Sequence, residues 1–174
     1  MSSLSSASPR SHPWEVIKQF QNLDWLVLTK RPELIADRLP SDWGDGYPNV
    51  WLGTTVESQD VIERIDVLAA IPACVRFVSA EPLVGPIRFG RRIELIDWII
   101  TGCESAVVEK RRPMDDRWIR AIRNECDRSD TPLFHKQYYR ATQLCFDGMI
   151  DGRQWQTFPE SAATRSALSL MAGA

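Results

Sequence analysis

Three glutamates in this sequence follow closely after short apolar runs, and a lysine lies inside another such run. The glutamates are Glu57, Glu81 and Glu104, and the lysine is Lys136. A carboxylate held beside a lysine is suited to proton transfer, to cation binding or to hydrogen bonding with a ligand hydroxyl. Glu81, Glu104 and Lys136 are therefore the candidate catalytic residues. The competing interpretation is a structural ion pair between a glutamate and Lys30 or Lys136.

Further side chains near the same run ends are candidates for binding a ligand. Gly102 is interpreted as a position where a ligand or a neighbouring loop approaches the backbone. His135 could act as a base or a ligand, and a hydrogen-bonded core histidine is slightly favoured. Arg112 precedes an expected helix, where it could hold a phosphate or carboxylate or lie in a solvated loop. The candidate ligand-binding residues are Lys30, Arg31, Glu57, Ser79, Gly102, Ser105, Arg112, His135 and Gln137.

Five apolar runs would position these side chains as strands. Most of the runs are continuous rather than alternating, which is typical of parallel strands covered on both faces. The carboxyl ends of parallel strands meet at one rim, so the polar residues would converge there. Because side chains alternate along a strand, Ser79 and Glu81 share one face, whereas His135 and Lys136 point to opposite faces. The pattern leaves open which face a ligand contacts. The runs are Trp25–Thr29, Val50–Thr54, Val75–Ser79, Asp97–Thr101 and Pro132–Lys136.

Helical patterns separate most of these runs. Ser58 and Asp115 can cap two of the helices, and Pro40 would end another. Pro82–Leu95 is the exception, because its prolines and glycines predict a loop instead of a long helix. The predicted helices are Trp14–Leu23, Glu33–Leu39, Gln59–Ala70 and 116–128.

This alternation predicts an α/β fold with five parallel strands and alternating helices. An eight-unit barrel takes ~250 residues, so five units would take about 156, close to the patterned length here. A partial (β/α) barrel and an open, doubly wound sheet are both compatible with the pattern. We expect a disordered N-terminus at 1–13, a single partial barrel-like domain at 14–160 and a flexible tail at 161–174.

Composition narrows the classes of function. The 174 residues carry a formal net charge of -2, so the overall charge does not attract nucleic acid. Binding to nucleic acid stays possible, but nothing in the sequence supports it. No apolar run reaches the ~20 residues of a membrane span, and we expect a cytoplasmic protein. The cysteines are too widely spaced for a metal clamp or a dense disulfide scaffold, and no metal ligands are assigned. They are Cys74, Cys103, Cys126 and Cys145.

Seven segments resemble, in order, the motifs of a phage and prophage family labelled Gp thirty-seven/Gp sixty-eight, a domain of unknown function similar to radical-SAM proteins. The resemblance covers about Leu23 to Pro159. Three glycine-containing motifs of the family differ here, at Cys103, at 106–111 and at Tyr138-Tyr139, and the loss of glycines would restrict a loop around a ligand. The segments are LTKRPE at 28–33, NVWLGTTVES at 49–58, RFVSAEPLVGPI at 76–87, IDWIITGCES at 96–105, RRPMDDRWIR at 111–120, FHKQYY at 134–139 and DGRQWQTFP at 151–159.

The resemblance implies that the chain is the C-terminal portion of a radical-SAM-like domain. Family members usually begin with a cysteine-rich segment that would hold a [4Fe–4S] cluster, and that segment is missing here. The four dispersed cysteines do not replace it, because a cluster needs closely spaced thiolates. No cofactor is therefore expected on this chain alone. S-adenosylmethionine and the cluster would be bound only together with a cluster-bearing partner.

Three functions follow as hypotheses, and whether the chain is an enzyme is left open. The first is the substrate-binding part of a split radical-SAM-like enzyme, not catalytic alone and completed by a partner that supplies the missing N-terminal barrel units. The second is a non-catalytic remnant that binds a ligand or partner and forms a homo-oligomer, because open sheets leave unpaired edges. The third, ranked last, is a metal-dependent hydrolase or nuclease using the glutamates and His135.

Overall fold

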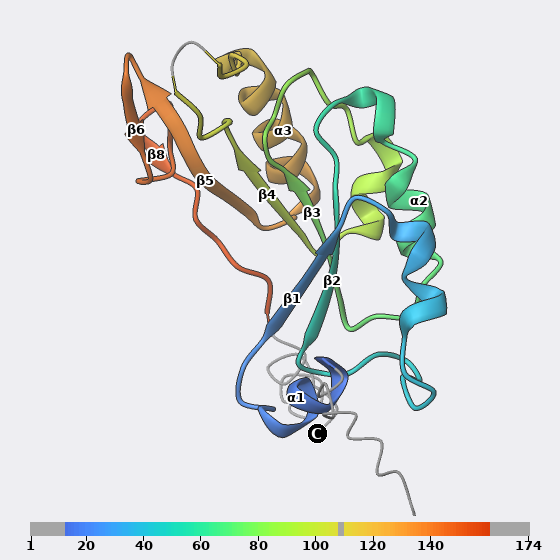
Figure 1. The fold of residues 1–174 in the computed structure, drawn as a ribbon. Coiled ribbons are helices and arrows are strands. Elements are labelled where there is room, and N and C mark those ends of the chain that lie inside the picture. Colours follow the sequence, from blue (N-terminus) through green and yellow to red (C-terminus); the bar gives the residue numbers. More distant parts are fainter. Residues whose placement is uncertain (1–12, 108–109, 161–174) are drawn as a thin grey trace, which may run out of the picture.

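The main element of the fold is an open, six-stranded sheet, seen in a computed structural model that describes residues 13–107 and 110–160 (Figure 1). The strand order is β1-β2-β3-β4-β5-β6, and the first five strands are parallel. Strand β6 pairs antiparallel with β5, and the sheet does not close into a barrel. The strands are β1 Trp25–Thr29, β2 Val50–Thr55, β3 Val75–Ala80, β4 Trp98–Gly102, β5 Leu133–Arg140 and β6 Gln143–Cys145.

Short helices and a small hairpin complete the described part of the chain. The hairpin consists of β7 Met149–Ile150 and β8 Arg153–Gln154. None of the described helices is long and apolar enough to cross a membrane. The α-helices are α1 Pro13–Gln19, α2 Arg64–Ala69 and α3 Asp116–Ser129, and the 3-10 helices are η1 Pro32–Leu34, η2 Ala36–Arg38, η3 Gln59–Val61 and η4 Gly90–Leu95.

The five predicted strands and the last predicted helix are confirmed. Helix α3 begins after Asp115, whose carboxylate accepts a hydrogen bond from the backbone N–H of Arg117 at 2.8 Å. The first helix ends at Gln19 instead of Leu23, and the two middle helices are also shorter than predicted. Glu33–Leu39 forms 3-10 turns that end before Pro40, and Gln59–Ala70 is divided into η3 and α2. Ser58 precedes η3 but makes no side-chain cap.

One face of the sheet is buried beneath helices α2 and α3, and we call it the helix-covered face (Figure 1). Ile65 of α2 and Ile122 of α3 pack into one core with Val78 of β3 and Ile99 of β4. Because these strand residues share a face, both helices must lie on the same side of the sheet. The strand order also follows the chain order without reversal.

The opposite face, here called the open face, carries an aromatic cluster instead of helices. Trp51, Phe77 and Trp98 are buried there, and Phe158 from the C-terminal part of the described chain packs against Trp98. Gly53 lies beneath the ring of Phe77, where an added Cβ would overlap the ring atoms. Glycine in β2 therefore lets the ring lie flat across the strand.

We predict that Gly53→Ala destabilises the fold by about 1–3 kcal/mol, because the buried Phe77 ring cannot move aside without disturbing Trp98. Urea denaturation monitored by circular dichroism measures the change. Val67→Ala on α2 is the matched control, since Val67 is exposed and its truncation should cost much less. Equal stability of wild type and Gly53→Ala would contradict this account of the open face.

Candidate functional site

The predicted site residues at the strand ends come together mainly as acid–base pairs at the carboxyl edge of the sheet. Glu57 follows β2, Glu81 follows β3 and Glu104 follows β4. Each carboxylate is bonded to a basic side chain from another part of this edge. We call these the three edge pairs: Glu57 with Lys30, Glu81 with Lys136, and Glu104 with Arg112.

The pair of Glu81 and Lys136 spans three strands. The Lys136 Nζ lies 2.9 and 3.0 Å from the two carboxylate oxygens of Glu81. Strand β4 lies between β3 and β5, so the bridge must pass over its end. Gly102 occupies that position, and an added Cβ would come within 3.2 Å of the Glu81 side chain. The sequence predicted that a ligand or a neighbouring loop approaches the backbone at Gly102. In the structure the group that approaches is the side chain of Glu81.

Glu57 is held by two cations. Lys30 contacts its Oε1, and the Nη1 of Arg64 donates to its Oε2 at 2.9 Å. Arg64 also donates to the carbonyl oxygen of Thr55 at 2.8 Å. Partial burial by itself raises the pKa of Glu57, but the hydrogen bond from Lys30 and the other interactions outweigh burial, and the pKa is lowered. Sequence reasoning missed Arg64. The available signal was its position seven residues after Glu57, at the start of α2, from which a long basic side chain can reach back to the end of β2.

Glu104 forms the third edge pair through a short return of the chain. Arg112 donates to it from its backbone N–H at 2.8 Å and from Nη2 at 2.6 Å. These hydrogen bonds lower the pKa of Glu104 to about 2. Glu57 also helps to raise the pKa of Arg112, so the pairs share one electrostatic neighbourhood. Glu104 therefore stays ionised at neutral pH and is a poor proton donor.

The edge pairs expose their cations and shelter their carboxylates. The carboxylate side chains are 18–25% exposed, whereas Lys30, Lys136 and Arg112 are 49–58% exposed. The ammonium and guanidinium groups therefore face solvent, above carboxylates that hold them in place. This arrangement favours contact with an anionic group of a ligand, because the cations retain accessible donors.

His135 lies apart from the edge pairs, against the helix-covered face. Its side chain is 1% exposed, and its Nδ1 lies 3.0 Å from the hydroxyl of Thr101. The ring stacks on Tyr138 and borders a hollow of about 460 Å³ next to Asp116 and Arg120. The structure thus agrees with the interpretation of a hydrogen-bonded core histidine and does not bring His135 together with the glutamates.

The other predicted ligand-binding residues differ in their surroundings. Ser79 is buried in β3, and Ser105 is exposed beyond β4. The guanidinium of Arg31 pairs with Glu33 at 3.2 Å. Gln137 is buried, and its amide donates to the carbonyl oxygen of Cys103 at 2.8 Å. Arg31 and Gln137 therefore have partners within the protein.

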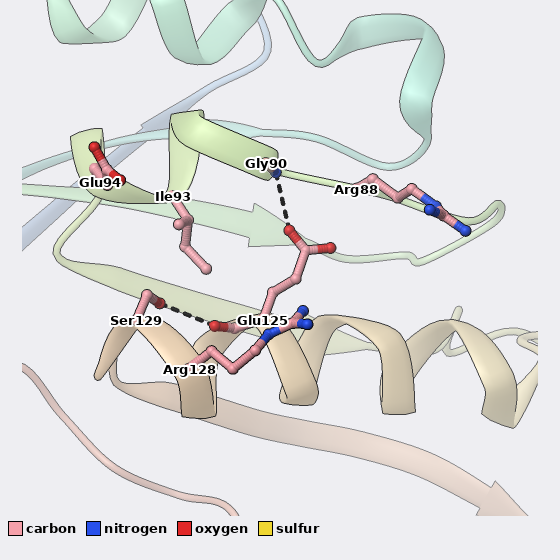
Figure 2. Close-up of a pocket in the computed structure, with 7 residues that line it drawn as sticks. All are labelled: Arg88, Gly90, Ile93, Glu94, Glu125, Arg128 and Ser129. Carbon is pink, nitrogen blue, oxygen red and sulfur yellow. Dashed lines mark hydrogen bonds between the residues drawn. The ribbon is translucent and has the colours of Figure 1, made fainter.

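A hollow that sequence reasoning missed lies between α3 and η4 (Figure 2). The carboxylate of Glu125 points to η4 and accepts hydrogen bonds from the backbone N–H groups of Phe89 and Gly90 at 3.0 and 2.9 Å. Glu125 thereby ties η4 to α3 and is not free for a ligand. The hollow has a volume of about 610 Å³ and is lined by Arg88, Gly90, Ile93, Glu94, Glu125, Arg128 and Ser129.

The described residues do not offer a metal site of the usual kind. No three His, Cys, Asp or Glu side chains within 13–107 and 110–160 lie close enough together to hold a metal ion. Cys103 and Cys126 are buried, and Cys74 and Cys145 are partly buried at other places in the fold. These thiols do not fit a [4Fe–4S] cluster, whose ligands must converge on one point.

The burial of His135 makes stability depend on pH. Loss of solvation lowers the pKa of this histidine from 6.5 to about 4, against smaller opposite effects of Asp147 and Asp116. The unfolded state therefore binds an extra proton between these values, and stability is complete above pH 6.5 and falls as the pH decreases. Between pH 7 and 5 we predict a loss of about 2 kcal/mol that His135→Gln does not show. Urea denaturation of both proteins at the two pH values tests this, and parallel losses would contradict it.

Comparison with known proteins places the chain in a family. Residues 6–159 match the family described as a protein of unknown function (DUF5131), which spans most of the sequence. No curated protein and no solved structure gives a significant match. The family match carries no statement about a phage origin, a radical-SAM relation or catalysis. On this match the chain belongs to the DUF5131 family of proteins of unknown function.

Proposed function

We propose that this chain is the ligand-binding part of a radical-SAM-like, phage-type α/β domain and does not catalyse a reaction alone. The five parallel strands follow one another in chain order, and α2 and α3 pack on the same face. This winding is typical of a (β/α) barrel, whereas a doubly wound sheet reverses its strand order and carries helices on both faces. The strand order and the position of the helices therefore support the interpretation of the open sheet as part of a (β/α) barrel.

The observation that carries the proposal is the row of exposed cations held by sheltered carboxylates at the carboxyl edge. Ligands of parallel α/β folds bind at this edge. A zwitterionic ligand suits the arrangement, since its carboxylate can bind Lys136 or Arg112 while its ammonium group approaches a glutamate. The methionine part of S-adenosylmethionine is such a group.

The same contacts argue against catalysis by this chain alone. Both oxygens of Glu81 are engaged by Lys136, and Glu104 has a pKa of about 2. Since the four cysteines do not fit a cluster, a separate cluster-bearing polypeptide would have to supply the redox chemistry. The metal-dependent hydrolase has no observation in its favour, because each of the three glutamates is bonded to a cation of its own.

Binding of S-adenosylmethionine to the purified chain, measured by isothermal titration calorimetry, tests the proposal. We predict that Lys136→Ala weakens binding about 10-fold or more, because a hydrogen bond to a charged group contributes about 1.5–3 kcal/mol. Lys18→Ala is the matched control. Lys18 also forms an ion pair, with Asp42 at 2.7 Å, but it lies in α1 and belongs to none of the edge pairs.

Two outcomes would overturn the proposal. The first is the absence of binding by the folded wild-type chain, or an equal loss in both lysine variants, which would remove the site from the carboxyl edge. The second is cleavage of S-adenosylmethionine by this chain alone, which would contradict the statement that it needs a partner for chemistry.

A further inference from the structure

The two edges of the sheet differ in how they are covered. On the far side of β5, Tyr138–Arg140 pair with β6. The amino-terminal half of β5 is covered as well, because the N–H of His135 donates to the carbonyl oxygen of Trp155 at 2.7 Å, and the N–H of Thr157 donates to that of Leu133 at 3.0 Å. At the other edge, no strand within the described ranges pairs with the outer side of β1 (Figure 1).

The free edge of β1 presents unpaired backbone groups. The N–H of Trp25 donates to Asn49, beside β2, so residues 25, 27 and 29 face β2 in the parallel ladder. The N–H and C=O groups of Leu26 and Leu28 consequently point outward. Proteins usually protect such an edge with a lysine, a proline or a bulge. The strand Trp25–Thr29 has the sequence WLVLT and contains no lysine or proline.

Apolar side chains gather beside this edge. Phe20, Leu23, Leu26 and Leu28 are 47–49% exposed, and they are four of the nine large hydrophobic residues that are exposed in the described part of the chain. All four lie within nine consecutive positions. Clustering of this kind marks an interaction surface, whereas single exposed apolar residues are ordinary.

A groove accompanies the edge on the side of the helices. It has a volume of about 720 Å³, and its lining includes Trp14, Ile17, Val27 and Ile35. A strand added to β1 would direct alternate side chains to this side and the others to the open face. The groove therefore offers space for apolar side chains of an added strand.

We propose that β1 pairs antiparallel with β1 of a second copy of this chain, around a two-fold axis at Val27. In this register Leu26 lies opposite Leu28 of the second copy, and the reverse pair is equivalent by symmetry. Both outward-facing residues then exchange N–H and C=O hydrogen bonds with the opposite strand. The half-exposed leucines of the two copies cover one another on the open face.

Charge complementarity identifies the second copy as the occupant. Asp24 precedes β1, Lys30 follows it, and the axis at Val27 sets Asp24 of each copy opposite Lys30 of the other. Asp24 is exposed and makes no ion pair with any other described residue. Moving the axis to Leu26 or Leu28 would set a leucine opposite a charged residue instead. The sequence around β1 is therefore complementary to itself in one register.

Sedimentation velocity over a range of concentrations tests the dimer with the full 174-residue chain. We expect a concentration-dependent monomer–dimer equilibrium for the wild type and a monomer for Leu26→Lys/Leu28→Lys at the same concentrations. Val67→Lys is the matched control, because it places a lysine on exposed apolar surface of α2. Circular dichroism reports whether each variant is folded, and exposed positions are chosen so that folding is retained.

A charge exchange tests the register independently of the leucines. Asp24→Lys alone sets lysines against lysines, and Lys30→Asp alone sets aspartates against aspartates, so each variant should dimerise at least 10-fold more weakly than the wild type. An equimolar mixture should recover the dimer, since both contacts become complementary in the mixed pair. A monomeric wild type at millimolar concentration, a dimer unaffected by these substitutions, or a mixture no better than its components would each overturn the proposal. Pairing of β1 only with a different polypeptide would also overturn it.

Discussion

Burial of the helix-covered face is the constraint on which the rest of the structure depends. Val78 and Ile99 are completely buried on that face, beneath Ile65 of α2 and Ile122 of α3, and Val50 is completely buried in a neighbouring cluster that includes Leu68 of α2. Because successive side chains of a strand point to opposite faces, burying this set fixes every neighbouring residue on the open face. A slip of one residue in any strand would exchange the two sets. The positions of the aromatic cluster, the edge pairs and the leucines of β1 all follow from this requirement.

The carboxyl edge shows how charges are kept beside an apolar sheet. Carboxylates that lose part of their hydration must find partners, and each of the three glutamates does so through a cation that remains half exposed. The bridge from Glu81 to Lys136 depends on the small size of Gly102, since a side chain there would meet Glu81. The edge is therefore stable without a ligand and still presents donors to one. Ligand-binding and structural interpretations of these residues are thus not exclusive, because the same ion pairs hold the cations that a ligand would meet.

The sequence predicted those helices and strands whose local signals, such as caps and apolar patterns, agree with the way the same residues pack in the core. Continuous apolar runs identified β1 to β5, and the cap at Asp115 together with one apolar stripe identified α3. The small strands β6 to β8 were missed for two reasons. The turn between β5 and β6 has Ala141 at positive φ, and alanine gives no signal of such a turn. The turn between β7 and β8 is an Asp151-Gly152 pair typical of hairpins, but its strands have two residues each and are too short to stand out as apolar runs. The middle helices were overestimated, since their short apolar stripes are also satisfied by 3-10 turns against the sheet. For the site, the strand ends located the glutamates, but the face of each strand depends on where the helices pack. For that reason the sequence placed His135 and Lys136 on opposite faces but did not show which of the two lies with the glutamates.

Lys30 links the two surfaces inferred from the structure. In the monomer it is bonded to Glu57, and its side chain is more than half exposed to solvent. In the proposed dimer, Asp24 of the second copy approaches the same ammonium group, which then lies between two carboxylates and offers less to an anionic ligand. Because linkage is reciprocal, a ligand that recruits Lys30 weakens the dimer by the factor by which the dimer weakens ligand binding. A ligand held by Lys136 and Arg112 instead leaves β1 untouched, so the two processes are then independent. Which cation the ligand engages thus determines whether occupancy of the carboxyl edge is communicated to the free edge of the sheet.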